Sequence, residues 1–331
     1  MAEQKPEPVK KTGKKIGCLG CSFSLGVFIV IITFLVLIIV SIAIGPIGNS
    51  IFKFNLPNWL KVPAPHVLLP AEPIFDIGPF AVTNSILTSW LTMVLLVVIM
   101  ALVMRRGKLI PGRFQSIIES AFDWLYNFCK EVAGPVNGRR FFPIITTIIL
   151  FVLFNGWLSL LPGFGSIMAH TAEGEVPLLR GANTDINTPL ALAIISFIFV
   201  EFMGISTLGI RYFKKFVNVG RFFQGWGKLF RGKVKSAFGD LFFGFVDAAV
   251  GGIEALSEIF RLISLTFRLF GNMIGGEILV FIFFFLMFVT PIIIPYGLEL
   301  LFGLIQALIF GFLTLVFATI ATTSSHEGEG H

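Results

Sequence analysis

The stretch SLTFRLFGNM at residues 264–273 places Arg268 in the middle of a long apolar run. A guanidinium group keeps its proton in a protein, so this side chain carries a permanent charge. At the centre of a bilayer such a charge costs about 2.5–3.5 kcal/mol on insertion scales. Long arginine side chains can reach the membrane surface from a helix end, but Arg268 lies too far from either end of its run. We therefore expect Arg268 to handle ions rather than only to stabilise a buried contact.

The composition indicates a membrane protein. Of the 331 residues, 55% are hydrophobic and 13% are charged, and Phe alone occurs 39 times. An average soluble domain has about 25% charged residues. The apolar runs follow one another so closely that no large soluble domain fits between them. The net charge of +6 does not indicate nucleic-acid binding, because the basic residues gather in short segments beside the apolar runs.

Six apolar elements are predicted, at residues 22–44, 83–104, 141–161, 189–210, 238–289 and 291–321. The fifth exceeds the ~20 residues of one perpendicular span, so it must be tilted, broken or partly interfacial. Residues 111–134 have apolar side chains at i, i+3 and i+4, which predicts an amphipathic helix on the surface. We expect an all-α polytopic membrane protein with six membrane-embedded helical elements, including a long tilted C-terminal helical hairpin.

The distribution of Lys and Arg predicts the orientation of the chain. Twenty of the 25 basic residues lie in three segments, 1–20, 105–140 and 211–235. By the positive-inside rule these segments and both termini are cytoplasmic. The predicted parts are a basic cytoplasmic tail (1–20), an extra N-terminal transmembrane helix (21–45), an extracytoplasmic segment (46–82), the main membrane domain (83–322) and a polar tail (323–331).

The N-terminal region offers no clear metal or redox site. Its apolar run is longer than the 7–15 residues of a signal-peptide core, and no A-x-A cleavage site follows, so we expect a retained helix. Cys18 and Cys21 form a lone C-x-x-C, which is weak evidence for metal binding; two small juxtamembrane residues, or a lipidation site, explain it as well. The four histidines have no metal-ligand spacing. We predict no metal and no cofactor.

The last two apolar stretches contain seven polar groups: Glu254, Glu258, Arg261, Arg268, Glu277, Glu299 and Gln306. At 100° per residue Arg261 and Arg268 share a helix face, Glu254 lies within about 40° of it, and Glu277 points to the opposite face ~13 Å along the axis. The last two groups share one face of the final helix. This layout is expected of two offset aqueous paths separated by a fixed cation. Charges that pair only to fix helix packing are the alternative, although four carboxylates and two arginines pair poorly.

The motif S-x-x-x-R-L-F-G-N-M-x-x-G-E at residues 264–277 closely resembles the signature of subunit a of F-type ATP synthases. Glu254 and Arg261 stand fourteen and seven residues before the arginine, as the family's carboxylate and basic residue do. Three further blocks resemble family segments: PGRFQ at 111–115, NTDINT at 183–188 and QALIF at 306–310. The resemblance covers about residues 65–322.

The resemblance implies a non-catalytic stator subunit with no catalytic residue of its own. The family arginine matched by Arg268 faces a rotating ring of c subunits, favours their ionised carboxylates and blocks a direct proton leak. Four residues match the half-channel open to the outside: Glu277, Glu299, Asn272 and Gln306. Three match the half-channel open to the cytoplasm: Glu254, Ser257 and Ser264. Arg261 and Glu258 are expected to be auxiliary charges.

The resemblance also implies partners and a location. We expect the c-subunit ring, peripheral-stalk b subunits and the lipid bilayer as partners, with no nucleic acid, in a bacterial inner membrane. Glu299 stands where some members have His, so the outer half-channel lacks a group that ordinarily titrates near neutral pH. Glu201, within the fourth predicted span, has no family role and could serve core packing or line the outer channel.

Two other function classes fit the sequence less well. A self-contained ion-coupled transporter predicts an internal repeat with paired broken helices, and no such duplication is visible. An intramembrane hydrolase or transferase needs a nucleophile and a base, or a metal cluster. No H-E-x-x-H and no G-x-S-x-G motif occurs in the chain.

Overall fold

The computed structural model describes residues 25–45, 70–105, 112–161, 163–171, 174–209, 212, 234–286 and 293–323. The chain divides into two units, residues 1–63 with 284–291 and residues 64–283 with 292–331. Several predicted features lie outside the described residues: the tail at 1–20, Cys18 and Cys21, residues 46–69, most of the basic segment 211–235, and the end of the chain from 324.

In the first unit, helix α1 (Leu25–Ile44) corresponds to the first predicted span. Large apolar side chains such as Phe28, Val30 and Ile39 are exposed on different sides of it. A helix that is hydrophobic all round is typical of a membrane span rather than of a soluble surface. Its apolar stretch Phe28–Ile42 is shorter than those of the other helices.

The second unit contains helices that are long and apolar enough to cross a membrane. With the last residues of α7 included, these are α3 (Asn84–Arg105), α4 (Arg113–Ser159), α5 (Asn187–Leu208), α7 (Val234–Leu286) and α8 (Ile293–Thr323). The ends of α3, α5 and α8 differ from the predicted spans by one or two residues. The predicted all-α polytopic membrane fold is confirmed, with these five spanning candidates and α1 as its helical elements.

Helix α4 joins the predicted amphipathic helix directly to the third span. The two parts meet at Gly134, whose φ of 78° and ψ of 169° are not helical. A positive φ suits glycine, and the following Pro135 disfavours a helical residue before it. In the first part Leu125 and Cys129 are buried, and the ring of Phe128 lies 4.1 Å from that of Phe312 on α8. The end of this amphipathic helix nearest Gly134 therefore packs against α8.

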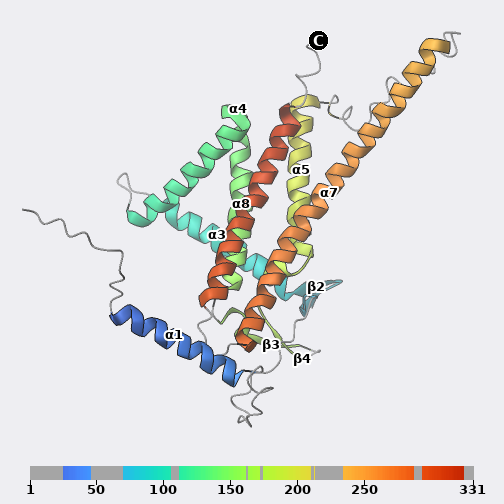
Figure 1. Ribbon diagram of the computed structural model, residues 1–331. Coiled ribbons are helices and arrows are strands. Elements are labelled where there is room, and N and C mark those ends of the chain that lie inside the picture. The colour runs from blue at the N-terminus through green and yellow to red at the C-terminus, as the bar shows by residue number, and fades with distance from the viewer. Residues whose placement is uncertain are drawn as a thin grey trace, which may run out of the picture. The chain divides into compact units, whose positions relative to one another are not determined.

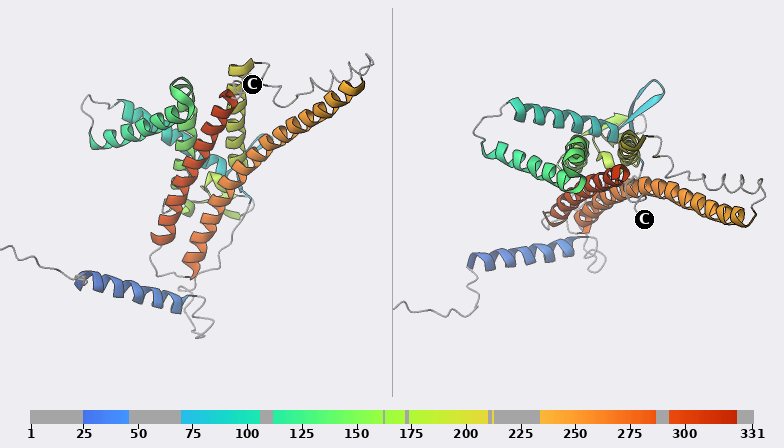
Figure 2. Two further views of the ribbon diagram at one scale, coloured as in Figure 1. Left: turned by 45° about the horizontal axis from the view of Figure 1, so that its top comes forward. Right: turned by 90° about the horizontal axis from the view of Figure 1, so that it is seen from above.

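Helix α8 packs between α4 and α5, and these three helices form the centre of the bundle (Figure 1; Figure 2). Small residues let the backbones approach, as is common between membrane helices. A Cβ atom on Gly311 of α8 would overlap the side chain of Ile149 on α4. Between α5 and α8 the hydroxyls of Ser196 and Thr314 are hydrogen-bonded at 2.7 Å.

Helix α7 is one unbroken helix of 53 residues. At 1.5 Å per residue it is about 80 Å long, far more than the ~30 Å hydrocarbon core. It must therefore be tilted or extend beyond the membrane, and a break, one of the three alternatives left open by the sequence, is excluded. Leu265, Leu269 and Met273 are buried along one face of α7. Its first turns extend away from the bundle (Figure 1; Figure 2).

Two short antiparallel hairpins cap one end of the bundle, and the all-α prediction missed them. They are β1 (Pro73–Ile77) with β2 (Phe80–Thr83), and β3 (Met168–Thr171) with β4 (Gly174–Pro177). Gly78 lies in the turn between β1 and β2 with a φ of 63°, and Gly174 begins β4 with a φ of 127°. The first hairpin falls mostly in the segment 46–82, which was predicted to be extracytoplasmic, and the second falls in the loop between two predicted spans. Strands of four or five residues give too little alternation to be predicted.

Candidate functional site

Arg268 lies on an open face of α7. The side chains of Ser257, Ser264 and Arg268, which follow one another at helical spacing, are all exposed. A Cβ atom added at Gly271 or Gly275 would meet nothing within 4 Å. No ion pair joins Arg268 to another residue in the part of the chain that the structure describes. The open face of α7 therefore presents a guanidinium group beside glycines, whose lack of side chains leaves room for another helix.

Two predicted carboxylates, Glu277 of α7 and Glu299 of α8, line one cavity of about 420 Å³, which we call the outer cavity. Glu72 and Arg180 also line it, so three acids and one guanidinium face the same space. The structure thus brings together two residues that are distant in the sequence and were predicted to belong to one half-channel.

The carboxyl group of Glu299 fits against a notch in α7. The side chain is only 3% exposed, and a Cβ atom on Gly276 would overlap its carboxyl oxygens. Any residue larger than glycine at position 276 would therefore displace Glu299. This close approach, rather than a bend in α7, explains one of the glycines of the motif.

Asn272 and Gln306, the other two residues predicted for the outer half-channel, do not line the outer cavity. Each has a buried amide nitrogen without a hydrogen-bond partner among the described residues. Leaving such a donor unsatisfied costs about 1–3 kcal/mol, and buried donors of this kind usually bind water. Along α7, Asn272 lies ~7.5 Å from Glu277 and ~6 Å from Arg268. The two amides are thus suited to bind water at the depth between the cavity and the arginine.

Arg261 is surrounded by partners. Its guanidinium group contacts the Glu258 carboxylate, lies 4.0 Å from Oε1 of Glu201 on α5, and lies 4.3 Å from the ring centroid of Phe317 on α8. Burial, and next the charge of Glu201, raises the pKa of the Tyr212 phenol beyond the end of α5. Of the two roles left open for Glu201, the structure supports core packing.

The residues predicted for the cytoplasmic half-channel do not gather around the outer cavity. Ser257 and Ser264 are exposed on the open face of α7, and Glu254 is half-buried. Any path through these groups therefore runs along the surface of α7 rather than through the centre of this bundle.

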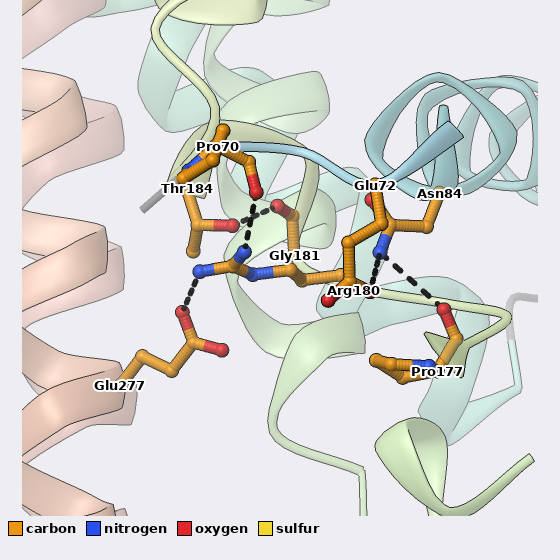
Figure 3. A network of polar contacts seen from close by, with 8 residues as sticks. All are labelled: Pro70, Glu72, Asn84, Pro177, Arg180, Gly181, Thr184 and Glu277. Carbon is orange, nitrogen blue, oxygen red and sulfur yellow. Dashed lines mark hydrogen bonds and ion pairs between the residues drawn. The ribbon is translucent and has the colours of Figure 1, made fainter. Parts of the chain in front are cut away.

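Arg180, which was not predicted as a site residue, pairs with Glu277 at the wall of the outer cavity (Figure 3). Its Nη2 donates to Oε2 of Glu277 at 3.2 Å, and its Nη1 donates to the Pro70 carbonyl oxygen at 3.3 Å. Nearby, Asn84 Nδ2 donates to Oε2 of Glu72 and to the Pro177 carbonyl oxygen, both at 3.3 Å. Its position in the sequence could have singled it out: Arg180 is the single Lys or Arg residue of the segment 162–188 and stands three residues before the NTDINT block.

The NTDINT block, which leads into α5, is hydrogen-bonded to α3 and α4 near the outer cavity. The Asn155 amide of α4 donates to Oδ1 of Asn183 at 3.4 Å, and the Ala182 N–H donates back to Oδ1 of Asn155 at 3.3 Å. Ser85 of α3 donates to Oδ2 of Asp185 at 3.1 Å. The block therefore has a structural role that its polar composition alone did not reveal.

Comparison with known proteins relates this chain to one subunit type. The family model described as ATP synthase A chain matches residues 86–319. The chain is 30% identical to ATP synthase subunit a of Gloeobacter violaceus, over 72% of this chain and 84% of that protein. It is 31% identical to ATP synthase subunit a 1 of Syntrophotalea carbinolica (72% and 85%) and to ATP synthase subunit a of Geotalea daltonii (75% and 89%).

Proposed function

This chain belongs to the ATP synthase subunit a family, and we propose that it provides two offset proton half-channels separated by Arg268. The family consists of non-catalytic membrane subunits of the rotary F-type ATP synthase, which agrees with the prediction of no catalytic site in this chain. As a member it works in a complex with other subunits. We propose that ion flow through it drives a ring of c subunits.

The observation that carries the proposal is the open face around Arg268. A guanidinium group at bilayer depth needs an anion or water, and within the described residues no carboxylate pairs with it. Gly271 and Gly275 leave room for a partner helix beside it. A carboxylate on each c subunit fits both conditions, because it would supply the missing charge as it passes.

The outer cavity is the proposed entry from the outside. Glu277 and Glu299 would pass protons between the cavity and deeper water, and the unpartnered amides of Asn272 and Gln306 would hold that water. On α7, Glu277 and Asn272 lie successively closer to Arg268, so these groups lead from the cavity toward the arginine. A proton that reaches this depth would be handed to a c-subunit carboxylate rather than continue straight across.

The proposed cytoplasmic path uses Glu254, Ser257 and Ser264 along the open face. Ser257 and Ser264 are exposed beside Arg268, so the ring itself would form the other wall of this path. Arg261 and Glu258 are paired within the chain, which supports an auxiliary rather than a direct role.

The mechanism follows from electrostatics. A cation within ~4–6 Å of a carboxylate lowers its pKa by about 1–3 units, so Arg268 would favour release of the proton from the c subunit facing it. A membrane potential adds about 2.3 kcal/mol per charge per 100 mV, which biases the direction of rotation. The fixed cation also opposes the passage of a free proton between the half-channels.

We also propose an orientation and a cellular location for this chain. The clustering of basic residues supports cytoplasmic termini, and the bacterial relatives support a bacterial inner membrane. Helix α1, which lies outside the matched range 86–319, and the peripheral-stalk b subunits are proposed to contribute to assembly rather than to ion flow.

The test is ATP-driven proton pumping by the whole complex in inside-out vesicles. We expect Arg268→Ala to abolish pumping and to allow a passive proton leak through membranes stripped of the catalytic sector. Arg139→Ala, which removes an exposed arginine at the start of the third span, is the matched control and should pump normally. Normal pumping by an assembled Arg268→Ala complex would refute the role of Arg268.

A further inference from the structure

We infer that Arg180 is a positioning residue that holds the Glu277 carboxylate at the wall of the outer cavity. The inference rests on the proposed function, since it assigns to the outer half-channel a residue outside the motif around Arg268. It also distinguishes the two predicted glutamates: Glu277 is held by a cation, whereas Glu299 has no ion pair among the described residues.

The contact geometry supports a fixed guanidinium group. Arg180 is 9% exposed, and its two Nη atoms donate to two separate segments, Glu277 of α7 and the Pro70 carbonyl oxygen before β1 (Figure 3). A planar guanidinium can serve both acceptors at once, whereas an ammonium group of lysine is a compact point charge. The pair therefore connects the outer loops to α7 through a single side chain.

The backbone that carries Arg180 is itself held in place. A Cβ atom on the next residue, Gly181, would lie 3.1 Å from the Ser159 side chain and 3.3 Å from Thr184. The Thr184 hydroxyl donates to the Gly181 carbonyl oxygen at 2.7 Å, and the Ala182 N–H donates to Asn155. Arg180 thus projects from a loop anchored on α4, and the position of Glu277 is set relative to that anchor.

The other groups around the cavity leave Glu277 as the partner of Arg180. Glu72 accepts from the Asn84 amide, Glu299 lies in the Gly276 notch, and Tyr296 provides a phenol. Without the guanidinium group, the Glu277 side chain could rotate about its own torsions and leave the cavity wall. Proton transfer depends on reach, so a carboxylate that moves would slow entry without opening a leak.

The test is a double-mutant cycle on proton transport by the whole complex in vesicles. We expect Arg180→Gln to reduce pumping severalfold, with no increase in passive leak, and Arg180→Lys to restore part of the rate. In a Glu277→Asp background, where the shorter side chain already breaks the contact, Arg180→Gln should have little further effect. Glu175→Gln, which removes the exposed pair with His170 in the hairpin β3–β4, should pump normally.

Independent, multiplicative effects of Arg180→Gln and Glu277→Asp would overturn the inference, as would normal pumping by an assembled Arg180→Gln complex. If the glutamine variant does not assemble, the cycle is measured with Arg180→Lys, and independent, multiplicative effects of Arg180→Lys and Glu277→Asp overturn the inference. Arg268→Ala in the same vesicles separates the two proposals. Normal pumping by that variant would refute the proposed function. If Arg268→Ala stops pumping but the effects of Arg180→Gln and Glu277→Asp are independent, only the role of Arg180 is refuted.

Discussion

The two arginines of α7 show how the same side chain can serve two purposes in one helix. Arg261 and Arg268 are seven residues apart and were predicted to share a face. Arg261 is 13% exposed and contacts Glu258, with Glu201 and Phe317 nearby. Arg268 is exposed, and the described residues provide no ion pair for it. The difference arises from the neighbouring helices α5 and α8, which reach one arginine and leave the other open.

We propose that this contrast distinguishes a structural arginine from one that acts in proton transport. A charge whose partners lie in its own chain stabilises that chain, and removing it leaves uncompensated carboxylates. A charge such as Arg268, which has no ion pair among the described residues, is available to a group that approaches from outside. Loss of Arg261 should therefore affect assembly first, and loss of Arg268 should affect proton flow first.

The largest effect on stability is expected from Arg261→Met. It leaves two mostly buried carboxylates without their cation, which costs about 3–5 kcal/mol when one partner of a buried pair is removed. We expect little subunit in membranes and no increase in proton leak from the complexes that do assemble, measured by immunoblotting and vesicle acidification. The triple variant Glu201→Gln, Glu258→Gln and Arg261→Met should recover the abundance, because no charge is left unpaired. A triple variant as unstable as the single one would contradict this account.

A smaller effect is expected from Gly276→Ala. The added methyl group overlaps the Glu299 carboxyl group, which is the flexible end of that side chain and must therefore move out of the notch. Pumping should fall while the leak stays at the wild-type level. Gly252→Ala is the matched control on the same helix, because its Cβ atom would meet nothing within 4 Å. Equal pumping by the two variants would show that the notch has no part in the outer half-channel.

The membrane helices were the most predictable part of the fold. Apolar runs of about 20 residues give a strong signal, and the ends of α3, α5 and α8 follow from it within two residues. The continuity of α7 was not predictable, since its glycines are compatible with either a bend or close packing. The hairpins β1–β2 and β3–β4 were missed because short strands beside prolines and glycines resemble loops.

The candidate site was predictable only where residues belong to a motif. Glu277 and Glu299 were selected from the resemblance, and the structure brings both to one cavity, although their role in transport stays a prediction. The contacts of Arg180 and Glu201 could not be predicted, because each residue is separated from its partner by about 60 to 100 residues of sequence. Periodicity describes one helix at a time and does not tell which loop or neighbouring helix will supply a partner.

The smallest effect is expected from Glu201→Gln, which alters only the more distant partner of Arg261. The Arg261–Glu201 separation is 4.0 Å, whereas Glu258 is in direct contact, and Coulomb attraction falls with distance. We expect a slight fall in the thermal stability of the detergent-extracted complex, with normal pumping. Glu258→Gln should destabilise the complex more. If Glu201→Gln instead stops pumping in a stable complex, Glu201 belongs to the proton path, and the division between a structural Arg261 and a transporting Arg268 fails.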